Sequence, residues 1–102
     1  MYKKIDYTIT KAGSENNKIV IYCNYYKVID FVYNILEYSV LSDYIMNANK
    51  TSNLVMTVEF DNTFEFSVYD KFLRDILESY ITLEKCHDLV YENMEDEIHG
   101  KV

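Results

Sequence analysis

The sequence predicts an α+β fold: a single domain of ββαββα order, in which a four-stranded antiparallel sheet carries two helices on one face. Two segments near the N-terminus alternate polar and apolar residues, which is typical of half-buried strands. Two later segments space their apolar residues as amphipathic helices do. With 102 residues, 49% of them hydrophobic, the chain is long enough for one core and too short for two.

The first two strands are predicted from alternation and from the turn between them. Lys4–Thr10 alternates polar and apolar residues with the two-residue period of a strand. The polar run Lys11–Asn17 interrupts the pattern, and Lys18–Cys23 resumes it. Two such segments separated by turn-forming residues predict a β-hairpin.

The first helix is predicted to begin at about Tyr26, where the apolar residues take up helical spacing. These residues are Val28, Ile29, Val32, Tyr33, Ile35, Leu36 and Val40. Only Asp30, Asn34 and Glu37 form a polar stripe, so we expect a mostly buried helix. The polar run Asn47–Asn53 is expected to be the loop that follows it.

A second hairpin is predicted after that loop. Leu54–Phe60 alternates as a third strand, and Phe64–Val68 alternates as a fourth. A three-residue loop, Asp61–Thr63, keeps the apolar faces of the two strands in register. The pairs then expected to lie opposite each other are Phe60 with Phe64 and Val58 with Phe66.

The last helix is predicted to begin at a capping box formed by Ser67 and Asp70, with Asp in place of the usual Glu or Gln. A straight helix continuing to about Glu97 would be roughly 45 Å long, longer than a domain of this size is wide. We therefore expect either a kink near Ile81–Thr82 or a projecting end that packs on a second copy. The expected dimer interface follows three- and four-residue steps through Tyr80, Leu83, His87, Val90 and Met94.

The two halves of the chain resemble each other in pattern and differ in charge. Residues 1–102 form the single domain, with a weak pseudo-repeat of 1–50 and 51–102. Phe31–Glu37 shares four of seven residues with Phe72–Glu78. The formal net charge of −7 divides into +1 for residues 1–50 and −8 for residues 51–102. The acidity therefore belongs to the second half.

Enzymatic and metal-dependent functions are not indicated. The chain has two glycines and neither a P-loop nor a Rossmann fingerprint. Cys86 and His87 are neighbours, so on a helix they project about 100° apart and cannot act as a nucleophile and its base. Together with His99 and Cys23 they lack the short paired spacing of zinc ligands. We expect no enzymatic activity, no metal and no cofactor.

The expected location is the cytoplasm of a bacterial host cell. Residues 1–9 lack the apolar core of a signal peptide, and the most hydrophobic stretch, residues 28–46, is interrupted by Asp30, Asn34, Glu37 and Asp43. Phe, Tyr, Met, Ile, Asn and Lys, which have A/T-rich codons, make up 48 of the 102 residues, as in a low-GC bacterium or its phage. In a reducing compartment, Cys23 and Cys86 are expected to be buried thiols rather than a disulfide.

Direct binding of nucleic acid is a weaker interpretation. Lysines and tyrosines alternate in the first half of the chain and could form a stacking platform for a single strand. The net charge of −8 in the second half would, however, repel phosphates. We expect no nucleic-acid ligand and no membrane contact.

The acidic half is the strongest functional signal. The predicted register places Glu59 opposite Glu65, with Asp61 at the tip, although like charges facing each other destabilise a sheet. Further acids follow along one face of the last helix, where pairs four residues apart repel each other. Locally unfavourable charges of one sign suggest a role outside the fold. The candidate partner-binding residues are Glu59, Asp61, Glu65, Glu84, Asp88, Glu92 and Glu95.

Small size, strong acidity in residues 51–102 and the absence of catalytic motifs resemble, as a class, the anti-CRISPR proteins that phages use against host defence. The resemblance lies in composition and charge layout and carries no site residues. It implies a non-enzymatic inhibitor whose carboxylates imitate phosphates and block a basic, nucleic-acid-binding groove on a partner protein.

Two other functions fit the same sequence. One is a homodimeric structural or regulatory module that pairs through the last helix. The other is an immunity or antitoxin protein, which would also be small and acidic but would block a toxin's active site. The sequence does not separate these from the inhibitor.

Overall fold

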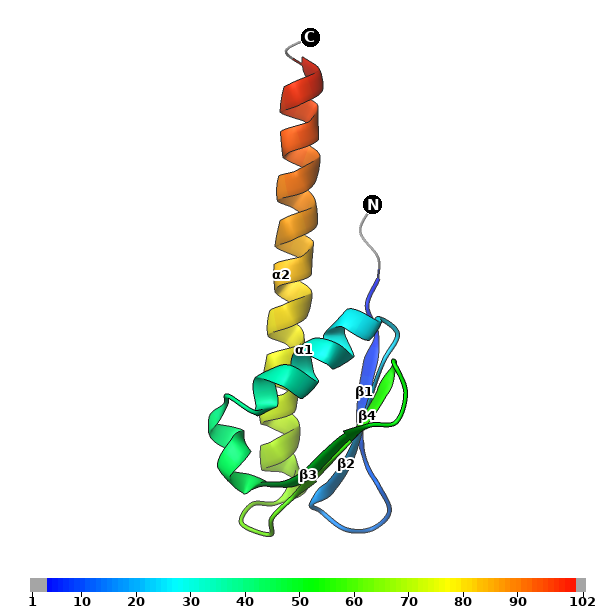
Figure 1. Cartoon of the computed structure of the whole chain (residues 1–102), viewed down its shortest axis with the longest axis vertical. Coiled ribbons are helices and arrows are strands. Elements are labelled where there is room, and N and C mark those ends of the chain that lie inside the picture. The colour runs from blue at the N-terminus through cyan, green and yellow to red at the C-terminus, as the bar shows by residue number, and fades with distance from the viewer. Residues whose placement is uncertain (1–3, 101–102) are drawn as a thin grey trace.

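A computed structural model of the chain describes the backbone of residues 4–100 and the side chains of residues 4–87 (Figure 1). Its elements are β1 (Tyr7–Lys11), β2 (Lys18–Cys23), α1 (Tyr26–Leu36), the 3₁₀ helix η1 (Val40–Tyr44), β3 (Ile45–Lys50), β4 (Val55–Phe60) and α2 (Phe66–Gly100). The predicted α+β class and ββαββα order are confirmed. The short helix η1 is an addition between α1 and β3.

The four strands form one antiparallel sheet in the order β1-β2-β4-β3. The predicted first hairpin is confirmed, and its register pairs Ile9 with Ile21. Ile19 of β2 lies beside Val58 of β4, which in turn lies beside Ala48 of β3. The strands therefore present a continuous apolar row to the helices.

Both helices pack on that face of the sheet and enclose the core. Val28, Ile29, Val32 and Leu36 of α1 are buried, as the helical spacing predicts. From α2 the buried residues are Tyr69, Leu73, Leu77 and Ile81. The two helices also contact each other, with the rings of Phe31 and Tyr80 centred 4.9 Å apart. Among the described residues, no buried side chain is charged.

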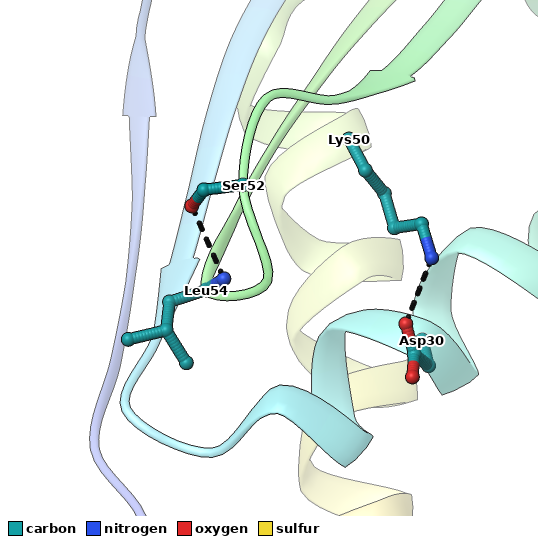
Figure 2. A network of polar contacts seen from close by, with 4 residues as sticks. All are labelled: Asp30, Lys50, Ser52 and Leu54. Carbon is teal, nitrogen blue, oxygen red and sulfur yellow. Dashed lines mark hydrogen bonds and ion pairs between the residues drawn. The ribbon is translucent and has the colours of Figure 1, made fainter.

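The predicted loop at Asn47–Asn53 is wrong, because Ile45–Lys50 forms the edge strand β3. Its pairing with β4 compensates for the low strand propensity of Asn and Ala. The ammonium of Lys50, the last residue of β3, lies 2.9 Å from the carboxylate of Asp30 in α1, and this ion pair connects the two elements (Figure 2). The β3–β4 turn is closed by Leu54, whose N–H donates to Ser52 Oγ (Figure 2).

The predicted fourth strand at Phe64–Val68 is also wrong, and so are the three-residue loop and its pairing register. Phe66 is the first residue of α2, and Val55–Phe60 pairs instead with β3 and β2. The buried Tyr69 stacks on Phe60 with ring centroids 4.0 Å apart and planes 7° apart. The packing of this aromatic pair in the core favours a helix here, although the alternation of polar and apolar residues is typical of a strand.

α2 begins one residue before Ser67, so the predicted capping box is wrong. Asp70 instead pairs with Arg74 one turn later, at 3.0 Å. The predicted kink at Ile81–Thr82 is absent, because the helix is continuous from Phe66 to Gly100. At about 1.5 Å per residue it is about 52 Å long, and its C-terminal part extends beyond the sheet and α1 (Figure 1).

Candidate protein-binding surfaces

The acids predicted on the second hairpin do not form a row. Glu59 is half-buried on the face of β4 away from the helices, between Lys18 of β2 and Asn47 of β3. Glu65 is exposed and immediately precedes α2, so it does not lie across a strand pair from Glu59. The predicted like-charged pair is wrong, because the segment carrying Glu65 is not a strand.

Asp61 has a structural role in the connection between β4 and α2. Its carboxylate accepts hydrogen bonds from the Thr63 N–H at 2.9 Å and the Tyr69 hydroxyl at 3.2 Å. Hydrogen bonds from the Thr63 side chain and backbone hold the pKa of Asp61 below its ordinary value. The Tyr69 hydroxyl also accepts from the Phe64 N–H at 3.3 Å. Asp61 therefore shapes the β4–α2 connection.

The acids of α2 whose side chains are described all have partners within the chain. Asp70 pairs with Arg74 at 3.0 Å, and Asp75 lies 3.9 Å from Lys71. Glu78 accepts a hydrogen bond from the Tyr7 hydroxyl at 2.6 Å, which ties α2 to β1. Glu84, a predicted site residue, accepts from the Tyr80 hydroxyl at 2.7 Å. These contacts account for the acids of the N-terminal part of the helix.

The remaining predicted acids, Asp88, Glu92 and Glu95, lie outside the described side chains. Their backbone is helical, because α2 continues to Gly100. In sequence, residues 88–100 contain five acids and no Lys or Arg. We call this stretch the distal segment of α2. The acidity of the second half is therefore concentrated on the part of the helix that extends beyond the sheet and α1 (Figure 1).

Positions on the helical backbone separate the two predicted rows of α2. Successive residues are about 100° apart, so the positions of the acid row, 84, 88, 92 and 95, fall within about 60° of the direction of the buried Leu77. The positions of the predicted apolar row fall about 60–140° to one side of it. The two rows therefore follow adjoining faces of the helix, and they meet where the Tyr80 hydroxyl donates to the Glu84 carboxylate.

The predicted dimer interface is only partly available. Tyr80 is half-buried against Phe31 of α1, and burial, together with the hydrogen bond to Glu84, raises the pKa of its hydroxyl. Leu83 is 62% exposed and lies on the side of α2 away from the core. His87 is exposed, whereas Val90 and Met94 lie outside the described side chains.

Sequence reasoning missed a hollow of about 580 Å³ at the other end of the molecule, which polar residues such as Glu37, Ser42 and Asn47 line together with apolar ones. It lies between the end of α1, η1 and β3, and its lining includes Tyr33, Leu36, Ile45 and Ala48. Three apolar side chains in this region are highly exposed, namely Tyr38 (86%), Val40 (71%) and Met46 (65%). The predicted helical spacing included Val40, but α1 ends at Leu36 and Val40 begins η1, so the sequence did not indicate this hollow.

The cysteines differ from each other. Cys23 is buried as predicted, whereas Cys86 is exposed, because it lies on the solvent side of α2. Neither forms a disulfide. Within residues 4–87, no three His, Cys, Asp or Glu side chains come together as a metal site. None of the described helices combines the length and the apolar composition that a membrane crossing requires.

Comparisons with known proteins give no relative to argue from. No family model, no curated protein sequence and no solved structure matches the chain. The functional argument therefore rests on the geometry and charge of the chain itself.

Proposed function

We propose that this protein is a non-enzymatic inhibitor, of the kind phages use against host defence, that binds a basic nucleic-acid-binding groove of a partner protein. The contact is made by the distal segment of α2. The observation that carries the proposal is a long helix that leaves its own domain carrying five acids and no Lys or Arg over residues 88–100.

The charge of the distal segment is costly for the fold. Asp88 and Glu92 are four residues apart, where like charges repel by a few tenths of a kcal/mol. Glu95, Asp96 and Glu97 are near the C-terminal end of α2, where the helix dipole disfavours negative charge. These locally unfavourable charges support a role with a basic partner.

The geometry suits a groove. A single α-helix has a diameter of about 10–12 Å with its side chains, which is narrower than a nucleic-acid duplex, so a groove that accommodates a duplex has room for it. Acids at positions 88, 92 and 95 recur every three or four residues, about 4.5–6 Å along the axis. This spacing is comparable with that of successive phosphates on one nucleic-acid strand.

The proposal is tested by charge reversal with a matched control. The test variant carries Asp88→Lys, Glu92→Lys and Glu95→Lys, and the control carries Asp6→Lys, Glu15→Lys and Asp75→Lys, which are exposed acids of the domain. Both variants change the net charge by the same amount. The partner is captured from a bacterial lysate with the tagged wild type, identified by mass spectrometry and purified.

The expected result is a loss of at least tenfold in affinity for the test variant and less than threefold for the control. Affinity of the wild type should also fall at least tenfold between 50 mM and 500 mM NaCl, because exposed charges are screened. Equal losses in the two variants, or affinity that is indifferent to salt, would exclude the acidic contact. A partner that is a toxin enzyme without a nucleic-acid ligand would favour an immunity function instead.

The exposed Leu83 supports homodimerisation as a second candidate. A leucine that is 62% exposed on a long helix gains free energy when a second copy covers it. Light scattering at micromolar concentration should then give twice the monomer mass of 12.2 kDa. Leu83→Glu should restore the monomer, and Thr82→Glu, at an exposed neighbouring position, should not. A wild-type mass near 12.2 kDa would remove this candidate.

A further inference from the structure

We propose that the hollow beside β3 is a peptide-binding groove, which takes an extended, basic segment of a partner protein as an additional strand on the sheet. The segment would carry apolar residues at alternate positions. This surface involves α1, η1 and β3 and is independent of the distal segment of α2.

The first argument is that β3 is an open edge. It pairs with β4 on one side and is the last strand of the sheet on the other. The Phe60 N–H donates to the Asn17 carbonyl and the Cys23 N–H to the Leu54 carbonyl, so the even-numbered residues of β4 bond to β2. Hydrogen-bonded pairs alternate along antiparallel strands, which leaves the odd-numbered residues of β4 to bond to β3.

The register then assigns the groups on the open edge. Asn49 lies opposite Thr57, and Thr51 donates its N–H to the Val55 carbonyl at 3.0 Å, so these residues point their backbone groups at β4. Ala48 and Lys50 alternate with them, and their N–H and C=O groups point away from β4. Such groups can form the ladder with an added strand.

The open edge also adjoins the hollow, whose lining is mixed and whose apolar part comes from β3 and α1. Ala48 and Ile45 of β3 form one wall, and Leu36 and Tyr33 of α1 form another. A strand added to β3 would place every second side chain on the helix side of the sheet, where the hollow lies. The exposed Val40 and Met46 would then be covered as well. Strand addition beside a helix is a recurrent mode of peptide recognition.

The charges around the hollow also favour a basic peptide. Glu37 lines the hollow and Asp43 belongs to η1, and both side chains are exposed. Neither carboxylate forms an ion pair with a described residue. Lys50 lies over the Tyr33 ring but is already paired with Asp30 (Figure 2). The surroundings of the groove are therefore negative, which favours a segment containing Lys or Arg.

The test begins with a display library of random twelve-residue peptides, selected on the wild-type protein. The expected enriched peptides alternate apolar residues and contain an excess of Lys and Arg. One enriched peptide is then synthesised, and its dissociation constant is measured for the wild type, Ala48→Pro and Lys11→Pro. Both substitutions remove one N–H from an open edge, at β3 and at β1 respectively.

Ala48→Pro should bind the peptide roughly tenfold more weakly, about the value of one well-formed hydrogen bond, and Lys11→Pro should bind it within twofold of the wild type. Glu37→Gln with Asp43→Asn should weaken it at least threefold. A second measurement avoids any folding defect of the proline variant, because it uses wild-type protein and the peptide N-methylated at either odd or even positions. Only one of these two peptides should bind, since an added strand bonds through alternate residues.

Several outcomes would overturn the proposal. They are a selection that enriches no peptide, enriched peptides that are acidic, equal binding of both N-methylated peptides, and binding that Ala48→Pro and Lys11→Pro affect alike. Amide shifts of the bound protein in NMR spectra that cluster on α2 rather than on β3 and η1 would also overturn it.

Discussion

The two parts of α2 differ in the acidic residues that they carry and in the described contacts of those residues. From Phe66 to Ile81 the helix contributes four buried side chains to the core, and its acids contact Arg74, Lys71 and Tyr7. The distal segment has five acids in thirteen residues and extends beyond the sheet and α1. Charge that is paired within the fold stabilises it modestly. The comparison separates acids with described partners in the fold from a dense run of acids on the part of the helix that extends beyond the sheet and α1.

The largest expected effect is the difference in stability between a substitution on the buried side of α2 and one on its exposed side. Leu77→Ala removes a fully buried side chain and should lower the free energy of unfolding by about 3 kcal/mol, from the lost burial and the cavity. Leu83→Ala, at an exposed position, should change it by less than about 0.5 kcal/mol. Urea denaturation followed by circular dichroism measures both. Similar losses for the two variants would mean that Leu83 is covered, by this chain or by a second copy.

The next effect concerns the junction where α2 begins. Tyr69→Phe keeps the stack on Phe60 but removes the hydroxyl that bonds the Asp61 carbonyl and carboxylate and the Phe64 N–H. The expected loss is about 1–2 kcal/mol in the same denaturation experiment. Tyr80→Phe, which removes the single half-buried hydrogen bond to Glu84, serves as the control and should cost less. A neutral Tyr69→Phe would contradict the assigned role of the hydroxyl.

A pH effect of smaller size is expected from Tyr7. Burial, followed by the hydrogen bond and charge of Glu78, raises the pKa of Tyr7 above its ordinary value. The unfolded chain then loses this proton at lower pH than the folded protein does. Stability from this group is therefore fully present below about pH 10 and is lost as the pH rises through the folded pKa.

Unfolding midpoints measured from pH 8 to pH 11.5 check the sign. The fall in stability on the alkaline side should be shallower for Tyr7→Phe than for the wild type. Tyr22→Phe, at an exposed residue of β2, is the control and should leave the slope closer to that of the wild type. A steeper fall in Tyr7→Phe would show that the assigned direction is wrong.

The smallest effect is expected from the distal acids. Neutralising Asp88, Glu92 and Glu95 as Asn, Gln and Gln removes repulsion along the helix, so stability should stay equal or rise by less than about 0.5 kcal/mol. Asp70→Asn, which breaks the pair with Arg74, should instead cost a few tenths of a kcal/mol. Thermal unfolding compares the two. A clear loss in the triple variant would mean that the distal acids serve the fold.

The fold could be predicted where one face of an element is strongly buried. Ile9, Ile19 and Ile21 alternate on the inner face of the first hairpin, and α1 repeats its buried residues at helical spacing. β3 could not be predicted in this way, because its residues are half-buried or exposed and Asn47 and Asn49 disfavour strands. The predicted strand at Phe64–Val68 was wrong for the opposite reason. Its alternation is clear, but the contacts of Tyr69 place this segment at the start of a helix.

The candidate surfaces were predictable to different degrees. Sequence spacing predicted a row of acids along the last helix but left open whether that helix is continuous, which the structure shows. It was not sufficient to show that Asp61 is bonded within the chain or that Glu59 lies beside Lys18, because both depend on which segments pair. The hollow beside β3 depends on three elements meeting, and no local pattern records that.

The central claim is that the distal segment of α2 competes with nucleic acid for a partner's basic groove. The most direct test measures nucleic acid bound to the purified partner while this protein is titrated in. The wild type and the control variant, with lysine at positions 6, 15 and 75, should displace half of the nucleic acid at similar protein concentrations. The test variant, with lysine at positions 88, 92 and 95, should need a concentration at least ten times higher. Displacement by all three proteins alike, or binding of the wild type without any displacement, would contradict the claim.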